Sequence, residues 1–143
     1  MEVNELRIGN YIKYTYVLSN DIEFCKVTGV KNDGRVYFFR SDGCEISLDT
    51  NEIEPIELTG DILIKNGFFK RGYNEIYFIT PCVGYYEYYI SYQNIKDNKY
   101  SFVASGYKNG ELKRQIRLDN IKYLHELQNI FFSFTNQELE MKL

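Results

Sequence analysis

The single histidine, His125, is the residue in this chain best suited to acid–base chemistry. A general base needs an orienting carboxylate and a substrate group within hydrogen-bonding distance. Glu126 is adjacent in sequence, but adjacent residues on a helix point in different directions. No nucleophile can be assigned to His125 as a partner. We therefore expect His125 to bond a group of the preceding β segment rather than to catalyse a reaction.

The other residue types that could build an active site or a metal site are dispersed along the chain. The acidic residues are scattered, and nothing locates a cleft that would raise the pKa of one member of a carboxylate pair. Cys25, Cys44 and Cys82 form an odd set without paired spacing, which predicts reduced, packed thiols. A zinc site would need a closer ligand cluster, and glycine-rich phosphate loops are absent. The sequence predicts no enzyme, no metal and no cofactor.

A tyrosine-rich segment is compositionally the most unusual part of the chain. Its tyrosines are Tyr85, Tyr86, Tyr88, Tyr89 and Tyr92. Strand propensity and cross-strand aromatic packing explain such a run most simply, because tyrosine can pack its ring while its hydroxyl stays in water. Alternatively, exposed tyrosines form a recognition surface for a protein or stack on the bases of single-stranded nucleic acid.

Positive charge is concentrated in one region, which contains Lys108, Lys113, Arg114, Arg117 and Lys122. Lys113 and Arg117 share one face of a predicted strand and could follow a phosphate backbone. The chain as a whole carries a net charge of -3 and has a pI of about 5.3, which argues against a surface that binds polyanions throughout. A solvated strand that discourages aggregation is the favoured interpretation of these cations.

Composition limits the class of protein. Hydrophobic residues make up 44% of the 143 residues, so the chain can bury one sizeable core or two small ones. The sequence contains no run of about eighteen apolar residues, which a membrane-spanning helix would need. The N-terminus is too polar for a secretory signal. We expect a cytoplasmic protein that does not bind membranes.

The first third of the sequence is predicted to be all-β. Asp33 and Gly34 stand between two strand-like runs, which is a strong hairpin signal. Five short strands joined by tight turns predict a small SH3-like β-barrel over residues 1–57. Residues 53–55 would close this barrel.

Residues 58–143 are predicted to form an α+β subdomain that packs with the first as one unit. A short helix begins after its cap, Thr59, and ends at Gly67. An antiparallel β-meander follows as far as Leu118, with a turn at Asn109 and Gly110.

The C-terminal segment is predicted to contain an amphipathic helix and a short strand. Apolar residues recur every three or four positions from Ile121, and Asp119 or Asn120 can cap the helix. This helix is expected to cover the apolar side of the second sheet. Residues 139–143 alternate between apolar and charged, which predicts a half-buried strand.

Three stretches, taken in order, resemble a known family. They are Glu5–Tyr11, Ile53–Thr59 continuing through Asn66–Phe68, and Tyr123–Asn129 with Thr135–Leu139. Their order and spacing resemble a family of small uncharacterised proteins from phage, prophage and mobile regions of Bacteroidetes-type genomes. The resemblance is most specific at the His-Glu-Leu-Gln-Asn segment, and it implies a genomic context without an activity.

The sequence therefore favours a non-enzymatic accessory module that binds a host or phage protein. The candidate interaction surface consists of Tyr85, Tyr86, Tyr88, Tyr89, Tyr92, Lys113 and Arg117. The alternative is a nucleic-acid-binding module that uses the same tyrosines and cations of the second sheet.

Overall fold

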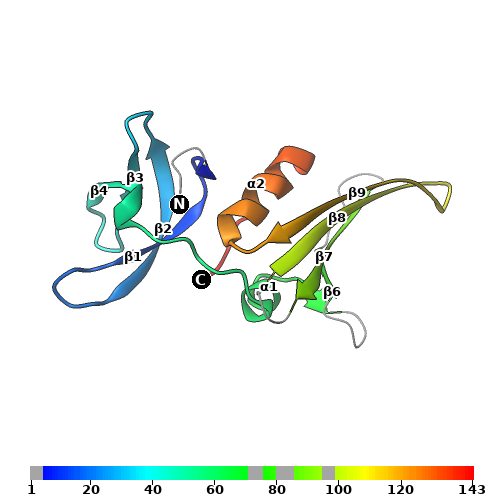
Figure 1. The fold of residues 1–143 in the computed structure, drawn as a ribbon, viewed down its shortest axis with the longest axis horizontal. Helices are drawn as coiled ribbons and strands as arrows, with labels where there is room; N and C mark the ends of the chain where they lie inside the picture. The colour runs from blue at the N-terminus through cyan, green and yellow to red at the C-terminus, as the bar shows by residue number, and fades with distance from the viewer. Residues whose placement is uncertain (1–4, 71–75, 80–85, 95–98) are drawn as a thin grey trace. The chain divides into compact units, whose positions relative to one another are not determined.

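A computed structural model describes residues 5–70, 76–79, 86–94 and 99–143 of the chain. Its fold is α+β, with antiparallel sheets and two α-helices, which confirms the predicted class (Figure 1). The chain divides into two compact units. Residues 1–57, 123–139 and 143 form unit 1, and residues 58–122 and 140–142 form unit 2.

Unit 1 is built on a four-stranded sheet in which each strand pairs with the next. The strands are β1 (Tyr11–Thr15), β2 (Ile22–Val30), β3 (Arg35–Phe39) and β4 (Glu45–Asp49). The long strand β2 pairs first with β1 and then with β3, and its register shifts between Val27 and Gly29. The turn between β2 and β3 contains Gly34 at a φ of 90°, as the Asp-Gly pair predicts.

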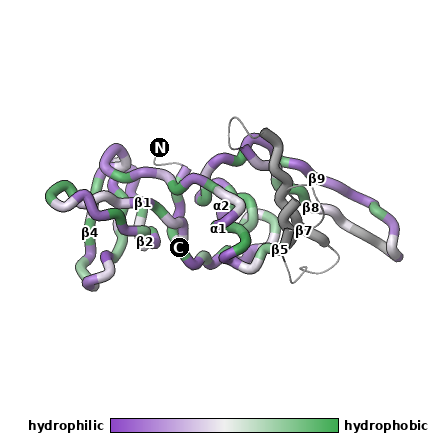
Figure 2. Tube along the Cα trace, turned by 90° about the horizontal axis from the view of Figure 1, so that it is seen from below, coloured by the Kyte–Doolittle hydropathy of each residue, from purple (hydrophilic) through white to green (hydrophobic). Residues whose placement is uncertain are grey.

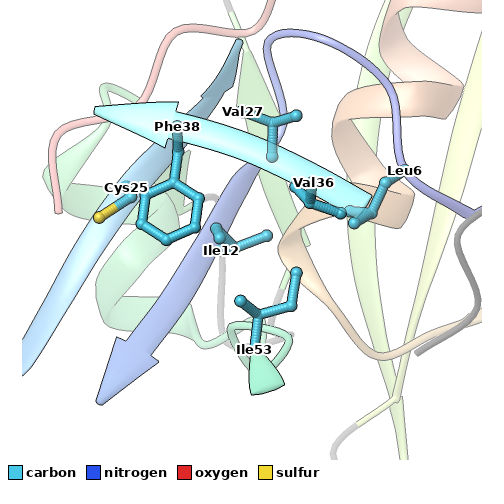
Figure 3. Close-up of a cluster of buried hydrophobic side chains, with 7 residues drawn as sticks. All are labelled: Leu6, Ile12, Cys25, Val27, Val36, Phe38 and Ile53. Atoms are coloured by element: carbon cyan, nitrogen blue, oxygen red, sulfur yellow. The ribbon is translucent and has the colours of Figure 1, made fainter. Parts of the chain in front are cut away.

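The core of unit 1 lies on one face of this sheet. Its buried side chains point toward one another (Figure 3): Leu6, Ile12, Cys25, Val27, Val36, Phe38 and Ile53. Ile12 pairs with Cys25 across β1 and β2, and both are buried. Residues that pair across an antiparallel ladder stand on the same face, so the alternation along each strand produces a single apolar layer.

A 3-10 helix, η2 (Thr50–Glu52), leads the chain back to β1. The Asp49 and Glu52 side chains form a capping box at its start. Lys13 and Glu54 then exchange two main-chain hydrogen bonds of 2.9 Å each, forming an isolated antiparallel bridge. The segment after η2 therefore returns to the free side of β1, while the strand order of the sheet is β1-β2-β3-β4.

Unit 2 contains helix α1 (Gly60–Lys65) and a five-stranded antiparallel sheet. The strands, in sequence and in spatial order, are β5 (Phe69–Lys70), β6 (Ile76–Ile79), β7 (Tyr86–Asn94), β8 (Lys99–Lys108) and β9 (Glu111–Ile121). Thr59 caps α1 as predicted, because its hydroxyl accepts a hydrogen bond of 3.2 Å from the Ile62 N–H. Leu63 anchors this short helix and is fully buried.

Strands β8 and β9 form a long hairpin (Figure 1). Asn109 and Gly110 both have positive φ angles at its turn, which is the backbone geometry that an Asn-Gly pair favours. Residues 100–106 of β8 are buried, whereas β9 is exposed along most of its length. Much of β9 is correspondingly hydrophilic (Figure 2).

Helix α2 (Leu124–Thr135) begins later than the sequence predicts. The capping residue is Tyr123, not Asp119 or Asn120, because β9 continues to Ile121. The Glu126 side chain accepts a hydrogen bond of 2.8 Å from the Tyr123 N–H and so protects the start of the helix. The helix also groups with the N-terminal residues in unit 1, whereas the sequence placed it over the second sheet.

The predicted C-terminal strand is absent from the structure. Leu139 and Met141 are buried and Glu140 and Lys142 are exposed, so the predicted alternation between buried and exposed residues is confirmed. However, side-chain amides replace a neighbouring strand as hydrogen-bond partners. The Asn66 amide bonds both the N–H and the C=O of Lys142.

Candidate functional site

The strand register of unit 2 places one predicted tyrosine in a row with one predicted cation. Tyr89 pairs with Val103, which pairs with Arg117. On the other side, Tyr89 pairs with Phe78, which pairs with Phe69. These five positions cross all five strands, and we call them the aromatic–arginine row. Phe69 is 47% exposed at one end of the row, and Arg117 is exposed at the other.

The remaining tyrosines of β7 occupy other rows. Tyr88 pairs with Ala104, Tyr92 pairs with Tyr100, and both of these β8 residues are buried. Tyr86 pairs with Gly106, which pairs with Arg114. Tyr85 lies outside the described residues. Since positions along a strand alternate between faces, the register joins Tyr89, and not its neighbour Tyr88, to Arg117.

Arg117 takes part in a small polar network. Its Nε lies 2.7 Å from Asp119 Oδ1, and its Nη2 donates to Ser101 Oγ at 3.1 Å. The Ser101 hydroxyl donates to the same carboxylate oxygen at 2.5 Å, which closes a triangle of contacts. The Arg117 side chain is still 55% exposed.

Lys113, the second predicted cation, also contacts a carboxylate of its own strand. Its ammonium group forms an ion pair with Glu111, and both side chains are more than half exposed. Each candidate cation therefore has an acidic neighbour two positions away, Glu111 for Lys113 and Asp119 for Arg117. The local charge of β9 is mixed, and the two cations do not form an isolated basic strip.

His125 is buried rather than presented to a substrate. It is 2% exposed, and its ring stacks on that of Tyr123 with centroids 5.8 Å apart. Within the described part of the chain its Nδ1 has no hydrogen-bond partner, so the predicted bond to the β segment does not form at this atom. Burial lowers the pKa of His125, while Glu126 and Glu5 act in the opposite direction.

Gln128 and Asn129 make the main polar contacts of α2 within unit 1. The Gln128 side chain is fully buried, and its Nε2 donates to the carbonyls of Gly9 at 3.2 Å and Leu139 at 3.1 Å. Asn129 Nδ2 donates to the Glu5 carbonyl at 2.7 Å. These amides attach α2 to the N-terminal loop, which satisfies buried main-chain groups of unit 1.

Arg7 completes this attachment from the N-terminal side. Its guanidinium donates two hydrogen bonds to the Glu138 carboxylate, at 2.6 and 3.0 Å, and one to the Gln128 carbonyl at 3.2 Å. It also lies 4.3 Å from the centre of the Phe132 ring. Residues near the N-terminus and residues of α2 and the segment after it thus bond one another, and these contacts hold unit 1 together.

The described thiols have different environments. Cys25 is buried in the core of unit 1, and burial raises its pKa to about 11. Cys44 is exposed, so the prediction of a packed thiol is wrong there. Cys82 lies outside the described residues. Among the described residues, no three His, Cys, Asp or Glu side chains gather as a metal site would require.

One cluster was not anticipated from the sequence. Tyr16 donates a hydrogen bond of 2.5 Å to Glu23, and the Arg40 guanidinium lies 4.8 Å from the centre of the Tyr16 ring. The Glu23 carboxylate also accepts a bond from the Ser41 N–H. The cluster ties the β1–β2 loop to the β3–β4 turn. Its residues come from two different hairpins, so no local spacing in the sequence marks the cluster.

Comparisons with protein-family models, with curated proteins and with solved structures find no match. Within the ranges that the structure describes, neither helix is long and apolar enough to span a bilayer.

Proposed function

We propose that this chain is a non-enzymatic accessory module of phage or mobile-element origin that binds another protein. The proposed contact surface lies at the exposed ends of the aromatic–arginine row of unit 2, Phe69 and Arg117, because Val103 within the row is buried. The observation that carries the proposal is the register that links Phe69, Tyr89 and Arg117 across the whole sheet. Aromatic residues and arginine are enriched in protein interfaces and among their energetically dominant residues.

The two ends of the row support this proposal. Phe69 is 47% exposed, so part of its phenyl ring offers apolar surface that a partner could bury. Arg117 is oriented by Asp119 and Ser101 and still exposes about half of its side chain. A preorganised guanidinium loses less conformational freedom on binding than a mobile one.

The charge pattern of β9 favours a protein over a nucleic acid. Phosphate recognition gains affinity when cations replace the counterions of the polyanion. Lys113 and Arg117 each have a carboxylate partner on their own strand, and these carboxylates would repel phosphate. Mixed, solvated charge is instead typical of the polar rim of a protein interface.

The location of His125 supports the non-enzymatic part of the proposal. The ring is 2% exposed and its Nδ1 is buried, so a substrate in solvent does not reach this atom. Acid–base catalysis requires the reacting proton to lie within hydrogen-bonding distance of the base.

We also propose that unit 1 is SH3-like. The support is the return of the chain after η2, where Glu54 pairs with Lys13 on the side of β1 opposite β2. Such pairing extends a meander toward a closed barrel and removes an exposed strand edge. The Phe24 side chain in this unit is 46% exposed and provides a matched comparison for Phe69.

Affinity capture of the tagged protein from the host lysate, with and without nuclease, tests the choice of partner. Bound material is identified by mass spectrometry after washes of increasing salt. The proposal predicts one protein enriched in both samples and retained at moderate salt. If nuclease treatment removes all bound partners, or if their recovery falls steadily as the salt concentration rises, the alternative of a nucleic-acid-binding module is correct.

A further inference from the structure

Two asparagines of this chain stand in the same tripeptide, Lys-Asn-Gly, which can react with its own backbone. They are Asn66, followed by Gly67, and Asn109, followed by Gly110. In such a pair the glycine nitrogen can attack the side-chain carbonyl carbon of the asparagine, because glycine has no Cβ to hinder the approach or to restrict backbone rotation. Since the tripeptides are identical, the fold decides which of the two pairs reacts faster.

The attacking nitrogen is held by a hydrogen bond at one pair and not at the other. The Gly67 N–H donates a bond of 3.1 Å to the Ile64 carbonyl where the chain leaves α1. The glycines of the two Asp-Gly turns, Gly34 and Gly43, donate similar main-chain bonds of 3.1 and 3.0 Å. Within the described ranges, the Gly110 N–H makes no hydrogen bond. Of these four nitrogens, that of Gly110 attacks without first losing a hydrogen bond.

The attacked side-chain amides differ in the same sense. The Asn66 Nδ2 donates to the carbonyls of Ile62 at 2.7 Å and Lys142 at 3.0 Å, and its Oδ1 accepts a bond from the Lys142 N–H. The Asn109 side chain is exposed at the tip of the β8–β9 hairpin, and it makes no hydrogen bond within the parts of the chain that the structure describes. Both reacting groups are therefore held at Asn66 and its glycine, and both are free at Asn109 and its glycine.

We propose that Asn109 is a site of spontaneous deamidation. The Gly110 nitrogen forms a bond to Asn109 Cγ and loses its proton, and the side-chain nitrogen leaves as ammonia, which closes a succinimide ring. Water then opens this ring. Hydrolysis at the Cγ carbonyl gives aspartate, and hydrolysis at the main-chain carbonyl gives isoaspartate, in which the chain continues through the former side chain. Water is the only co-reactant, and nothing is oxidised or reduced.

The products change the turn that joins β8 to β9. Either product adds one negative charge close to Glu111, which pairs with Lys108 across the turn. Isoaspartate also inserts a methylene into the main chain of this two-residue turn. Because turn type and loop length fix the register of a hairpin, the isoaspartate form should pair less regularly next to the turn. The chemistry depends on the turn alone, so it is independent of the protein-binding proposal made for the aromatic–arginine row.

Ageing of the full chain at mildly alkaline pH, followed by peptide mass spectrometry, tests the proposal with Asn66 as the internal control. In the folded protein Asn109 should convert about tenfold faster than Asn66, because the hydrogen bonds that must be broken at Asn66 are worth about that factor in rate. In denaturant the two asparagines should convert at similar rates. Equal rates in the folded protein, or the same difference in denaturant, would overturn the proposal.

Asn109→Gln is the matched variant, because its longer side chain would have to close a larger ring, which forms more slowly. Isoelectric focusing of the aged wild type should show an additional, more acidic band. Labelling with an isoaspartate-specific methyltransferase should mark the same material. Both signals should be lost from aged Asn109→Gln. An acidic band of equal strength in this variant would show that another residue reacts, and it would contradict the assignment to Asn109.

Discussion

The side-chain oxygen of Gln128 accepts a hydrogen bond of 3.0 Å from the main-chain N–H of Tyr11. This contact joins the first residue of β1 to the middle of α2 across more than a hundred residues of sequence. The same amide donates to the carbonyls of Gly9 and Leu139. Gln128 thereby satisfies main-chain groups of the N-terminal segment, at Gly9 and Tyr11, and of the C-terminal segment, at Leu139, and fixes their relative position.

Replacing Gln128 with alanine should destabilise unit 1 strongly. Three main-chain groups would lose their partner in a site from which water is excluded, and each such loss costs about 1–3 kcal/mol. We expect the free energy of unfolding to fall by about 2–4 kcal/mol. Urea denaturation measures it, with Gln137→Ala at an exposed position as the matched control. A change below about 0.5 kcal/mol, the usual range for surface substitutions, would contradict this role.

Gly9 is expected to be less tolerant of a side chain than Gly43. Both have positive φ angles, 96° and 82°, so alanine is strained at either position. At Gly9 a Cβ would also stand 2.9 Å from Glu138 Oε2, whereas nothing lies within 4 Å at Gly43. Gly9→Ala should therefore lower the melting temperature more than Gly43→Ala. Equal losses would mean that Glu138 moves aside without cost to its ion pair with Arg7.

The stability of the protein should decrease as pH falls through the range in which unfolded histidine titrates. Burial lowers the pKa of folded His125, so below about 6.5 the unfolded chain takes up a proton that the folded chain does not. The free energy of unfolding therefore decreases as the pH is lowered, until the pH falls below the pKa of His125 in the folded protein. Below that pKa, both states carry the proton and this contribution stops changing.

The single histidine makes this prediction simple to measure. A proton NMR titration of the folded protein should give one imidazole signal with a pKa below its usual value. In His125→Gln, the loss of stability caused by histidine protonation should disappear. Only the loss near pH 4, about where Asp and Glu become protonated, should remain. A pKa at or above that of free histidine would show that the ring is accessible.

The two described cysteines should react at very different rates. Cys44 is exposed, whereas Cys25 is buried with its pKa raised to about 11, so little thiolate is present at Cys25 at pH 8. Iodoacetamide followed by peptide mass spectrometry is expected to label Cys44 rapidly and Cys25 only after unfolding. Comparable labelling of both cysteines in the native protein would contradict the burial of Cys25 in the core of unit 1.

The local features of the fold followed from the sequence because local chemistry determines them. The Thr59 cap and the Asp-Gly and Asn-Gly turns depend on residues close together in the chain. The start of α2 was misplaced because the residues after Leu118 suit either the end of a strand or a helix cap. Tertiary pairing with β8 extends the strand to Ile121.

The long-range features could not be predicted in the same way. An amphipathic stripe shows that α2 packs against something, but it does not say which sheet. The attachment to unit 1 depends on Gln128 and Asn129, whose partners lie more than a hundred positions away. The link between Tyr89 and Arg117 likewise depends on the register of three strands, which a one-residue slip would reverse.

The most direct test of the proposed function compares two phenylalanines that are almost equally exposed. Phe69 in the aromatic–arginine row is 47% exposed, and Phe24 in unit 1 is 46% exposed. Each is changed to alanine, folding is verified by circular dichroism, and the nuclease-resistant partner retained from lysate is quantified. Phe69→Ala should reduce partner recovery severalfold, as Arg117→Ala should, while Phe24→Ala should leave it unchanged. Full recovery with Phe69→Ala, or a loss confined to Phe24→Ala, would contradict the proposal.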